Sequence, residues 1–312
     1  MATHDNTVGA QPAPIRLRAE GRRWGEVAVK IALALCALVS VATTVGIVVA
    51  LLEPSVEFFR DVSIVDFFSG DRWAPLFEPA SFGVQPLLVG TLMVTLCACV
   101  VCLPFGLGGA VYLSEYARPR VRQTLKPALE VLAGIPTVVY GFFALTFFTP
   151  LLQDVGVQVG VFNVLSAGLV MGVMLIPTVA SISEDAMTAV PQELRDGAYG
   201  LGASRLQVST RIVIPAAVSG IVASYVLAIS RAVGETMIVL IAAGGLAQIT
   251  FDPREPAQTM TAFIGATGIG DVPTGSIEYK TIFAVGLTLF VLTLAMNMIS
   301  IRLVRRFREI YE

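Results

Sequence analysis

The sequence predicts an all-α membrane protein with six transmembrane helices, and three observations support this prediction. Hydrophobic residues make up 55% of the 312 residues and charged residues only 14%, whereas about a quarter of the residues in a soluble domain are charged. The mean hydropathy, +0.77, is correspondingly high. Six apolar segments also reach the roughly 20 residues that a helix needs to cross a bilayer. Lipid is therefore the expected solvent for much of the chain.

The predicted spans form one transmembrane domain, residues 27–304, between an N-terminal tail (1–26) and a C-terminal tail (305–312). The first span is too long for the core of a cleavable signal peptide, so we expect it to be retained. Several spans contain Pro, which membrane helices tolerate where neighbouring helices satisfy the freed backbone groups. The spans cover residues 27–52, 86–113, 128–152, 161–183, 216–244 and 281–304.

Basic residues are concentrated on one side of the predicted spans. The positive-inside rule places that side, with both termini, in the cytoplasm of a multi-pass cell-membrane protein. The other side holds only Arg60, Arg72, Arg254 and Lys280, and Arg231 lies within the fifth span. Most of the 21 basic residues lie on the first side: Arg16, Arg18, Arg22, Arg23, Lys30, Arg118, Arg120, Arg122, Lys126, Arg195, Arg205, Arg211, Arg302, Arg305, Arg306 and Arg308.

Residue types that carry metal or nucleophilic chemistry are sparse. Cys36, Cys97, Cys99 and Cys102 all lie in apolar runs, where free cysteine behaves as a small hydrophobic residue, and His4 lies in the polar tail. We therefore expect no catalytic site, no metal site and no nucleic-acid partner. None of the three lysines lies in the Gly-Lys-Ser/Thr sequence of a phosphate-binding loop, so the chain is not expected to hydrolyse ATP itself or to hold a cofactor.

The outer loop, residues 53–85, is acidic and rich in turn-forming residues. Trp73 and Phe77 offer packing surface, which predicts an ordered loop rather than a flexible linker. Two interpretations stay open: the loop caps the helical bundle, or it is a docking surface for an external partner.

The cytoplasmic loop, residues 184–215, is unusually long for a connection between two spans. Its pattern predicts two short helices. Pro191 and Glu193 favour the start of the first, and Leu194, Ala198 and Leu201 are spaced as one apolar face. Gly202 interrupts this pattern, and Ser204 is a candidate N-cap for the second helix, which holds Leu206, Val208 and Ile212. Such helices lie on lipid headgroups or insert into a groove of a cytosolic partner.

This loop resembles the EAA loop of ABC-importer permeases. The family pattern is Glu-Ala-Ala, three residues, Gly, nine residues, Ile, one residue and Leu-Pro. The chain has Asp196-Gly197-Ala198, Gly202, Ile212, Ile214 and Pro215 at the same spacing. It departs from the pattern by Asp for Glu, Gly for Ala and Ile for Leu. The resemblance implies a coupling helix that docks on an ATP-binding subunit, with the coupling role on Glu193, Asp196, Gly197, Ala198, Gly202, Ala203 and Ser204.

Two charged residues interrupt the fifth predicted span. Arg231 and Glu235 are four residues apart, so on a continuous helix they share a face and can pair. A guanidinium matches the geometry of phosphate, and Ser230, Thr236 and the backbone at Gly234 could add hydrogen-bond donors. Intramembrane ionisable groups usually mark a transport pathway, although an ion pair that only fixes helix packing is the alternative.

The stretch Ser-Arg-Ala-Val-Gly-Glu-Thr-Met, 230–237, resembles a segment of phosphate-importer permeases of the PstC type. Further similar segments are Trp73-Ala-Pro75, Ala133-Gly-Ile-Pro136 and Thr259-Met-Thr-Ala262. The resemblance implies a type I ABC importer (MetI-like) permease fold, with a substrate-pathway role for Arg231 and Glu235. Ser230 and Thr236 join them in the predicted pathway as candidate hydrogen-bond donors. The resemblance also implies four kinds of partner: a homologous permease of the PstA type, a dimer of ATP-binding subunits that hold ATP and Mg, an extracytoplasmic phosphate-binding protein and membrane lipid.

Two other classes of protein share part of this pattern. A secondary anion transporter or channel that works without ATP would share the six spans and the buried arginine, but would not need the spacing from Asp196 to Pro215. A structural or assembly protein of the membrane would use the charged pair for packing alone. It would leave the acidic outer face and the cytoplasmic loop unexplained.

Overall fold

The structure is a computed structural model that describes residues 24–306, and these residues are mostly helical. The tail residues 1–23 and 307–312, with His4 and several of the tail arginines, lie outside the described residues. The chain divides into two units, residues 1–49 and 50–312, and helix α1 contributes to both. The helices of the first half are α1 (Trp24–Asp61), α2 (Ile64–Ser69), α3 (Gln85–Val111), α4 (Pro119–Ala133), α5 (Thr137–Phe143) and α6 (Thr149–Asp154).

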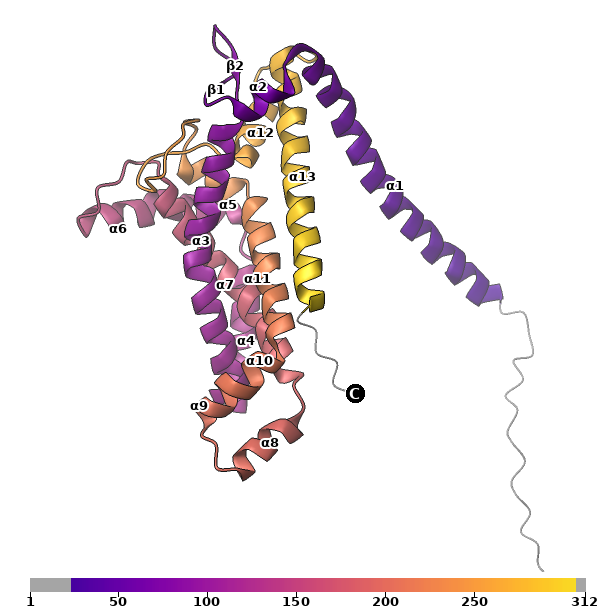
Figure 1. The fold of residues 1–312 in the computed structure, drawn as a ribbon, viewed down its shortest axis with the longest axis vertical. Coiled ribbons are helices and arrows are strands. Elements are labelled where there is room, and N and C mark those ends of the chain that lie inside the picture. Colours follow the sequence, from indigo (N-terminus) through magenta and orange to yellow (C-terminus); the bar gives the residue numbers. More distant parts are fainter. Residues whose placement is uncertain (1–23, 307–312) are drawn as a thin grey trace, which may run out of the picture. The chain divides into compact units, whose positions relative to one another are not determined.

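The second half continues with helices α7 (Val164–Thr188), α8 (Gln192–Gly200), α9 (Arg205–Val208), α10 (Ile214–Ala216), α11 (Val218–Val233), α12 (Met260–Gly268) and α13 (Ile277–Arg306). Wider π-helical turns are η1 (Tyr112–Tyr116), η2 (Ala144–Phe148), η3 (Ser209–Val213) and η4 (Val239–Ala243). The short strands β1 (Trp73–Ala74) and β2 (Ser81–Phe82) pair antiparallel, with Trp73 opposite Phe82. The second half runs from magenta to yellow in Figure 1.

Four of the six predicted spans are unbroken helices, and two are bent. α1, α3, α7 and α13 are each long and apolar enough to cross a membrane. The third span bends by 86° between α4 and the segment Thr137–Asp154, and the helices leading into and through the fifth meet at 71°. Among the described residues, the structure has four such helices, or up to six spans if each bent pair counts as one, and the sequence did not predict the two bends.

The bend in the third span has a local cause. Pro136 has no N–H, so it cannot donate to the Leu132 carbonyl four residues earlier, and it disfavours helical geometry at Ile135. The Tyr140 hydroxyl donates to that Leu132 carbonyl at 2.9 Å across the bend. A side chain beyond the break thus adds a donor to a carbonyl that otherwise accepts only from the turn at Gly134 and Ile135.

In the first unit, the described part of α1 is apolar on every side. Leu33, Leu38 and Val41 are each more than half exposed, and none of its most apolar 18-residue window is buried. A helix that is apolar all round is suited to a hydrocarbon environment.

In the second unit, α3 and α7 pack side by side through small residues (Figure 1). A Cβ on Gly168 would lie 2.4 Å from the Cys97 Cβ, and one on Gly172 would lie 2.7 Å from the Ala98 carbonyl oxygen. Glycine at these positions lets two membrane helices approach closely. α7 is consequently the most deeply buried long helix, with 61% of its apolar window buried.

The outer loop is ordered around an aromatic cluster. The Trp73 ring lies 4.9 Å from Phe263 of α12 and 6.1 Å from Phe67, both edge to face. Phe58 packs against Phe67 and Phe82 in the same cluster. The expectation of an ordered loop is confirmed for Trp73, but Phe77 is 69% exposed and adds no packing. The difference arises because Trp73 lies on a paired strand, whereas Phe77 lies in the turn beyond it.

The two loops singled out in the sequence lie at opposite ends of this second unit. Figure 1 shows the β1–β2 hairpin and α12 at one end, and α8 and α9 at the other. α3, α7 and α11 run between these ends, so they connect the two loops mechanically.

Candidate functional site

The first candidate site lies where α11 ends, at Arg231 and Glu235. The helix stops at Val233, with Gly234 as its C-cap, and helical structure resumes only at Met237. The prediction that Arg231 and Glu235 pair on one continuous helical face is therefore wrong. Gly234 interrupts the helix, so the four-residue spacing does not place the two side chains together.

Glu235 uses its carboxylate to cap the next helical segment. Its Oε1 accepts hydrogen bonds from the backbone N–H groups of Met237 at 3.0 Å and Ile238 at 3.4 Å. The residue is only 8% exposed. A carboxylate at the first N–H groups of a helix is favourable, because those groups have no partner within the helix and carry partial positive charge.

Arg231 lies in the last turn of α11 and is exposed on the surface of the chain. Its Nη1 donates to the Thr178 hydroxyl of α7 at 3.3 Å. None of the ion pairs formed among residues 24–306 involves Arg231. A guanidinium held by one neutral hydroxyl keeps most of its donors available for an anion.

The other two predicted pathway residues face different neighbours. Ser230 donates to the Asn297 Oδ1 of α13 at 3.1 Å, whereas Arg231 donates to Thr178 of α7. Thr236 is part of the break itself, and its hydroxyl lies 3.5 Å from the Gly234 carbonyl oxygen. The structure thus gathers Arg231, Glu235 and Thr236 around one helix break, and directs Ser230 to α13.

Neighbouring segments brace this break. The Thr261 hydroxyl of α12 donates to the Glu235 carbonyl at 2.6 Å. α5, which follows the bend in the third span, packs on the restarted segment at Gly141, where a Cβ would lie 3.0 Å from Ile241 and 3.2 Å from the Met237 carbonyl oxygen. The two broken spans therefore pack on each other, and a movement of either segment would disturb the other.

The second candidate site is the cytoplasmic loop, whose two predicted short helices are confirmed as α8 and α9. Pro191 is the N-cap of α8 and Glu193 lies in its first turn. Gly202 has φ +82°, and the N–H groups of Gly202 and Ala203 donate to the Tyr199 and Ala198 carbonyls. This is a Schellman motif, in which glycine accommodates the left-handed residue that ends a helix.

Ser204 caps α9 as predicted. Its hydroxyl accepts from the Gln207 N–H at 3.4 Å, while the Gln207 side chain accepts from the Ser204 N–H at 2.8 Å. This reciprocal capping box, together with the glycine stop before it, defines the angle between α8 and α9.

The predicted apolar face of α8 is only partly correct. Ala198 is buried at 8% exposure, but Leu194 is exposed and Leu201 is 91% exposed. The inward positions of this short helix are occupied by Ala198 and Arg195, which leaves the leucines facing outward. Glu193, Asp196, Gly197, Gly202 and Ser204 are also exposed, and Ala203 is half-buried. The loop therefore presents a mixed apolar and polar surface at the end of the bundle.

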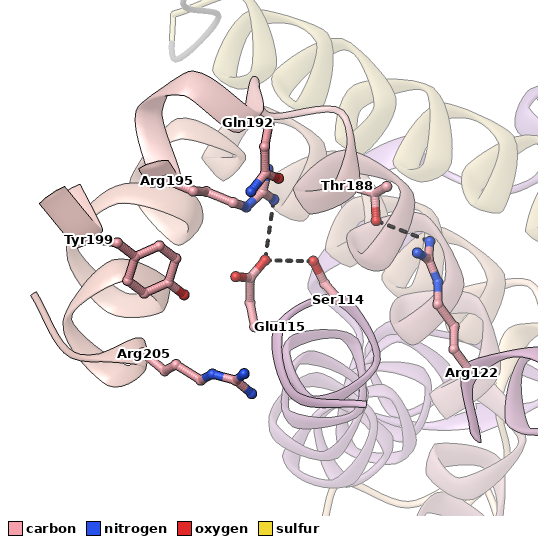
Figure 2. Close-up of a pocket in the computed structure, with 8 residues that line it drawn as sticks. All are labelled: Ser114, Glu115, Arg122, Thr188, Gln192, Arg195, Tyr199 and Arg205. Carbon is pink, nitrogen blue, oxygen red and sulfur yellow. Dashed lines mark hydrogen bonds and ion pairs between the residues drawn. The ribbon is translucent and has the colours of Figure 1, made fainter. Parts of the chain in front are cut away.

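Behind α8 lies a polar hollow of about 560 Å³. Figure 2 shows Glu115 at its centre, between Ser114 and the Arg195 side chain. Arg195 donates to Glu115 at 3.2 Å, and Ser114 donates to the same carboxylate at 2.8 Å. Neither Ser114 nor Glu115 is identifiable from the sequence, because no local pattern indicates that they face Arg195.

A second ion-pair cluster joins α4 to α7. Glu184 has a fully buried side chain and accepts hydrogen bonds from Arg122, Lys126 and Thr188. The Lys126 ammonium lies 2.7 Å from Glu184 and 2.6 Å from Asp185. Basic residues assigned only to membrane orientation therefore also form specific contacts with the start of the cytoplasmic loop.

Two solved ABC transporter structures contain chains with a similar fold. The chain superposes on a subunit of a bacterial alginate ABC transporter, crystallised with an alginate-bound periplasmic protein, with a TM-score of 0.63 and 16% identity, covering 92% of this chain and 98% of that one. For the MetNI methionine ABC transporter, the TM-score is 0.54 at 19% identity, covering 73% and 95%. The fold is therefore the predicted all-α, type I ABC importer (MetI-like) permease fold.

The chain belongs to the family of binding-protein-dependent transport system inner membrane components, whose model matches residues 103–309. A probable ABC transporter permease protein, YqgH of Bacillus subtilis (strain 168), is 33% identical over 276 residues, covering 88% of this chain and 89% of that protein. The phosphate transport system permease protein PstC of Mesorhizobium japonicum is 31% identical, covering 73% and 74%. That of Haemophilus influenzae is 29% identical, covering 92% and 95%. These relatives confirm the resemblance to PstC-type permeases, and membership of this family makes the chain a multi-pass membrane protein.

Proposed function

We propose that the chain is the transmembrane permease subunit of an ATP-driven importer of inorganic phosphate. It would form half of the translocation pathway and couple to a separate ATPase through the loop 184–215. Relatives named as phosphate permeases over most of the chain support the choice of substrate.

The observation that carries the phosphate assignment is the exposure of the Arg231 side chain and its lack of a carboxylate partner among the described residues. Its guanidinium is exposed, held by Thr178 and free of any carboxylate partner among the described residues. A planar fork of donors suits a tetrahedral oxyanion, and a site that binds through few fixed contacts can also release it. Glu235 takes a different part from the one expected from the sequence: it stabilises the helix break that presents Arg231, and Thr236 completes that break.

The loop around Gly202 supports coupling to a cytosolic ATPase. Its two capped helices form a defined shape, and exposed leucines lie beside acidic and small residues. This combination suits insertion of a short helix into a groove of a partner protein. Glu193, Asp196, Gly197, Ala198, Gly202, Ala203 and Ser204 are the residues to which we assign this coupling role.

The proposed complex contains four kinds of partner. These are a second permease of the PstA type, a dimer of ATP-binding subunits, an extracytoplasmic phosphate-binding protein and the surrounding lipid. ATP and Mg would be held by the ATP-binding subunits rather than by this chain. The bias of basic residues supports a cytoplasmic position for both termini and for the α8–α9 loop. Transport would then proceed by alternating access of rigid helical units around the pathway.

The proposal is tested by uptake into proteoliposomes that hold the complete complex and its binding protein. We expect phosphate uptake that requires ATP and is little reduced by excess sulfate or molybdate. A preference for sulfate or molybdate would overturn the substrate assignment. Phosphate uptake at the same rate without ATP would instead favour an ATP-independent anion transporter.

A further inference from the structure

We propose that Arg195, paired with Glu115, is the positioning residue that fastens the coupling helix α8 to the transmembrane bundle. This inference rests on the proposed coupling function and adds the means by which a displacement of α8 reaches the helices. It is carried by four contacts of the Arg195 and Glu115 side chains, all on the inner side of the loop (Figure 2).

Arg195 first ties α8 to the end of α7. Its Nη1 donates to the Val190 carbonyl at 2.5 Å, and its Nη2 donates to the Met187 carbonyl at 2.7 Å. The last carbonyls of a helix have no partner within the helix, and a cationic side chain there is favourable. The Arg195 guanidinium therefore adds a cationic donor to the last turn of α7 and to the turn that follows it.

The same guanidinium also reaches a different helix. Its Nη2 donates to the Glu115 Oε1 of η1 at 3.2 Å, and the Ser114 hydroxyl donates to the same oxygen at 2.8 Å. The side chains of Arg195 and Glu115 are only 10% and 6% exposed. Removing one partner of such a desolvated pair leaves the other charge uncompensated, so the pair strongly favours one position of α8 against η1.

The acceptors of Arg195 require a forked cation. Two carbonyls and one carboxylate lie around one guanidinium, whose fixed plane of N–H donors can serve all three at once. A lysine ammonium carries the charge but presents its three donors from a single atom. Arginine is therefore the residue that can bind α7 and η1 simultaneously.

The fastened helix leads directly to the proposed pathway. α7 extends from Met187, held by Arg195, back to Thr178, which contacts Arg231. Between these two residues of α7, the buried Ser183 hydroxyl forms a hydrogen bond of 2.8 Å with the Ser224 hydroxyl of α11. A displacement of α8 would therefore move α7 and α11 together. Without these contacts, α8 could move against the bundle while α7 and α11 stayed in place.

The test compares variants of the complete complex in proteoliposomes. Glu115→Gln and Arg195→Lys are measured for co-purification of the ATPase, stimulation of ATPase activity by the binding protein, and phosphate transported per ATP hydrolysed. We expect co-purification to be retained, because the outer surface of α8 is unchanged. We expect stimulation and transport per ATP to fall at least fivefold, within the usual range of about 5–150-fold for coupling between sites.

Glu57→Gln is the matched control, because it makes the same carboxylate-to-amide change in an ion pair at the other end of the unit. Glu57 pairs with Lys280 at 2.9 Å, and its loss should leave transport per ATP unchanged. Coupling as strong in Glu115→Gln and Arg195→Lys as in the wild type would overturn the positioning role alone. Wild-type complex without ATP-driven uptake would overturn the proposed function, and this inference with it.

Discussion

Arg231 and Thr178 are joined by a hydrogen bond of 3.3 Å that links the end of α11 to the middle of α7. The contact leaves most of the guanidinium unoccupied while limiting where it can move. An anion in the proposed pathway would therefore meet a cation that is positioned but not neutralised. The contact also connects the pathway to the helix on which the cytoplasmic loop is anchored.

Replacement of Thr178 by Val should weaken phosphate uptake without preventing assembly. Valine keeps the branched shape but removes the hydroxyl, and a hydrogen bond to a charged group contributes about 1.5–3 kcal/mol. Because the bond is long, we expect a loss at the lower end of that energy range. Such a loss corresponds to a fall of about tenfold in uptake at low external phosphate. Thr178→Ser, which keeps the hydroxyl, should retain most of the uptake. Equal uptake by all three proteins would show that the contact does not position Arg231.

Replacement of Gly202 by Val should disrupt coupling through the backbone. The residue has φ +82°, and open space surrounds the position of an added Cβ, so steric crowding by neighbours is not the cause. A non-glycine residue in such a conformation costs about 1–3 kcal/mol, which would alter the angle between α8 and α9. We expect loss of ATPase from the purified complex, or loss of ATPase stimulation by the binding protein.

Gly200→Ala provides the comparison for this variant, because Gly200 lies in α8 with negative φ and also faces open space. The Gly200→Ala complex should retain the ATPase on purification and should retain the stimulation of ATPase activity by the binding protein. If Gly202→Val also retained co-purification and stimulated ATPase activity, the assignment of this loop to coupling would have to be abandoned.

Replacement of Glu184 by Gln should destabilise the folded protein. The carboxylate is fully buried between Arg122 and Lys126, so the amide would leave Arg122 without a carboxylate partner and Lys126 with Asp185 alone. Breaking a buried ion pair costs about 3–5 kcal/mol, and the partial exposure of both cations favours the lower value. Asp185→Asn removes a contact of the same Lys126 from a largely exposed residue, and such pairs contribute about 0.2–1 kcal/mol. Thermal unfolding in detergent should therefore shift far more for Glu184→Gln; equal shifts would contradict the role of burial.

The sequence predicted those parts of the fold that depend on local pattern. Long apolar runs identify α3, α7 and α13, and the positions of Gly202 and Ser204 identify the ends of α8 and α9. Each of these features follows from residues that are close in the sequence, such as a capping side chain and the N–H group it binds.

The parts that it missed are one local helix break and several contacts between distant residues. Arg231 and Glu235 had the spacing of a helical pair, and only the break at Gly234 separates them. Gly followed by a carboxylate residue is a signal that could have suggested a helix end and a new start. Nothing local indicated that Arg195 would reach Glu115, 80 residues away in sequence, or that Ser230 would turn to Asn297.

The central claim, that Arg231 lies on the path of the transported phosphate, is tested most directly by phosphate uptake with the Arg231→Ala complex. The measurement compares ATP-driven uptake by wild-type and variant complexes at equal amounts of assembled ATPase. Because Arg231 is exposed and forms no ion pair among the described residues, its removal should leave assembly intact while abolishing uptake. Uptake by the variant at the wild-type rate would contradict the claim.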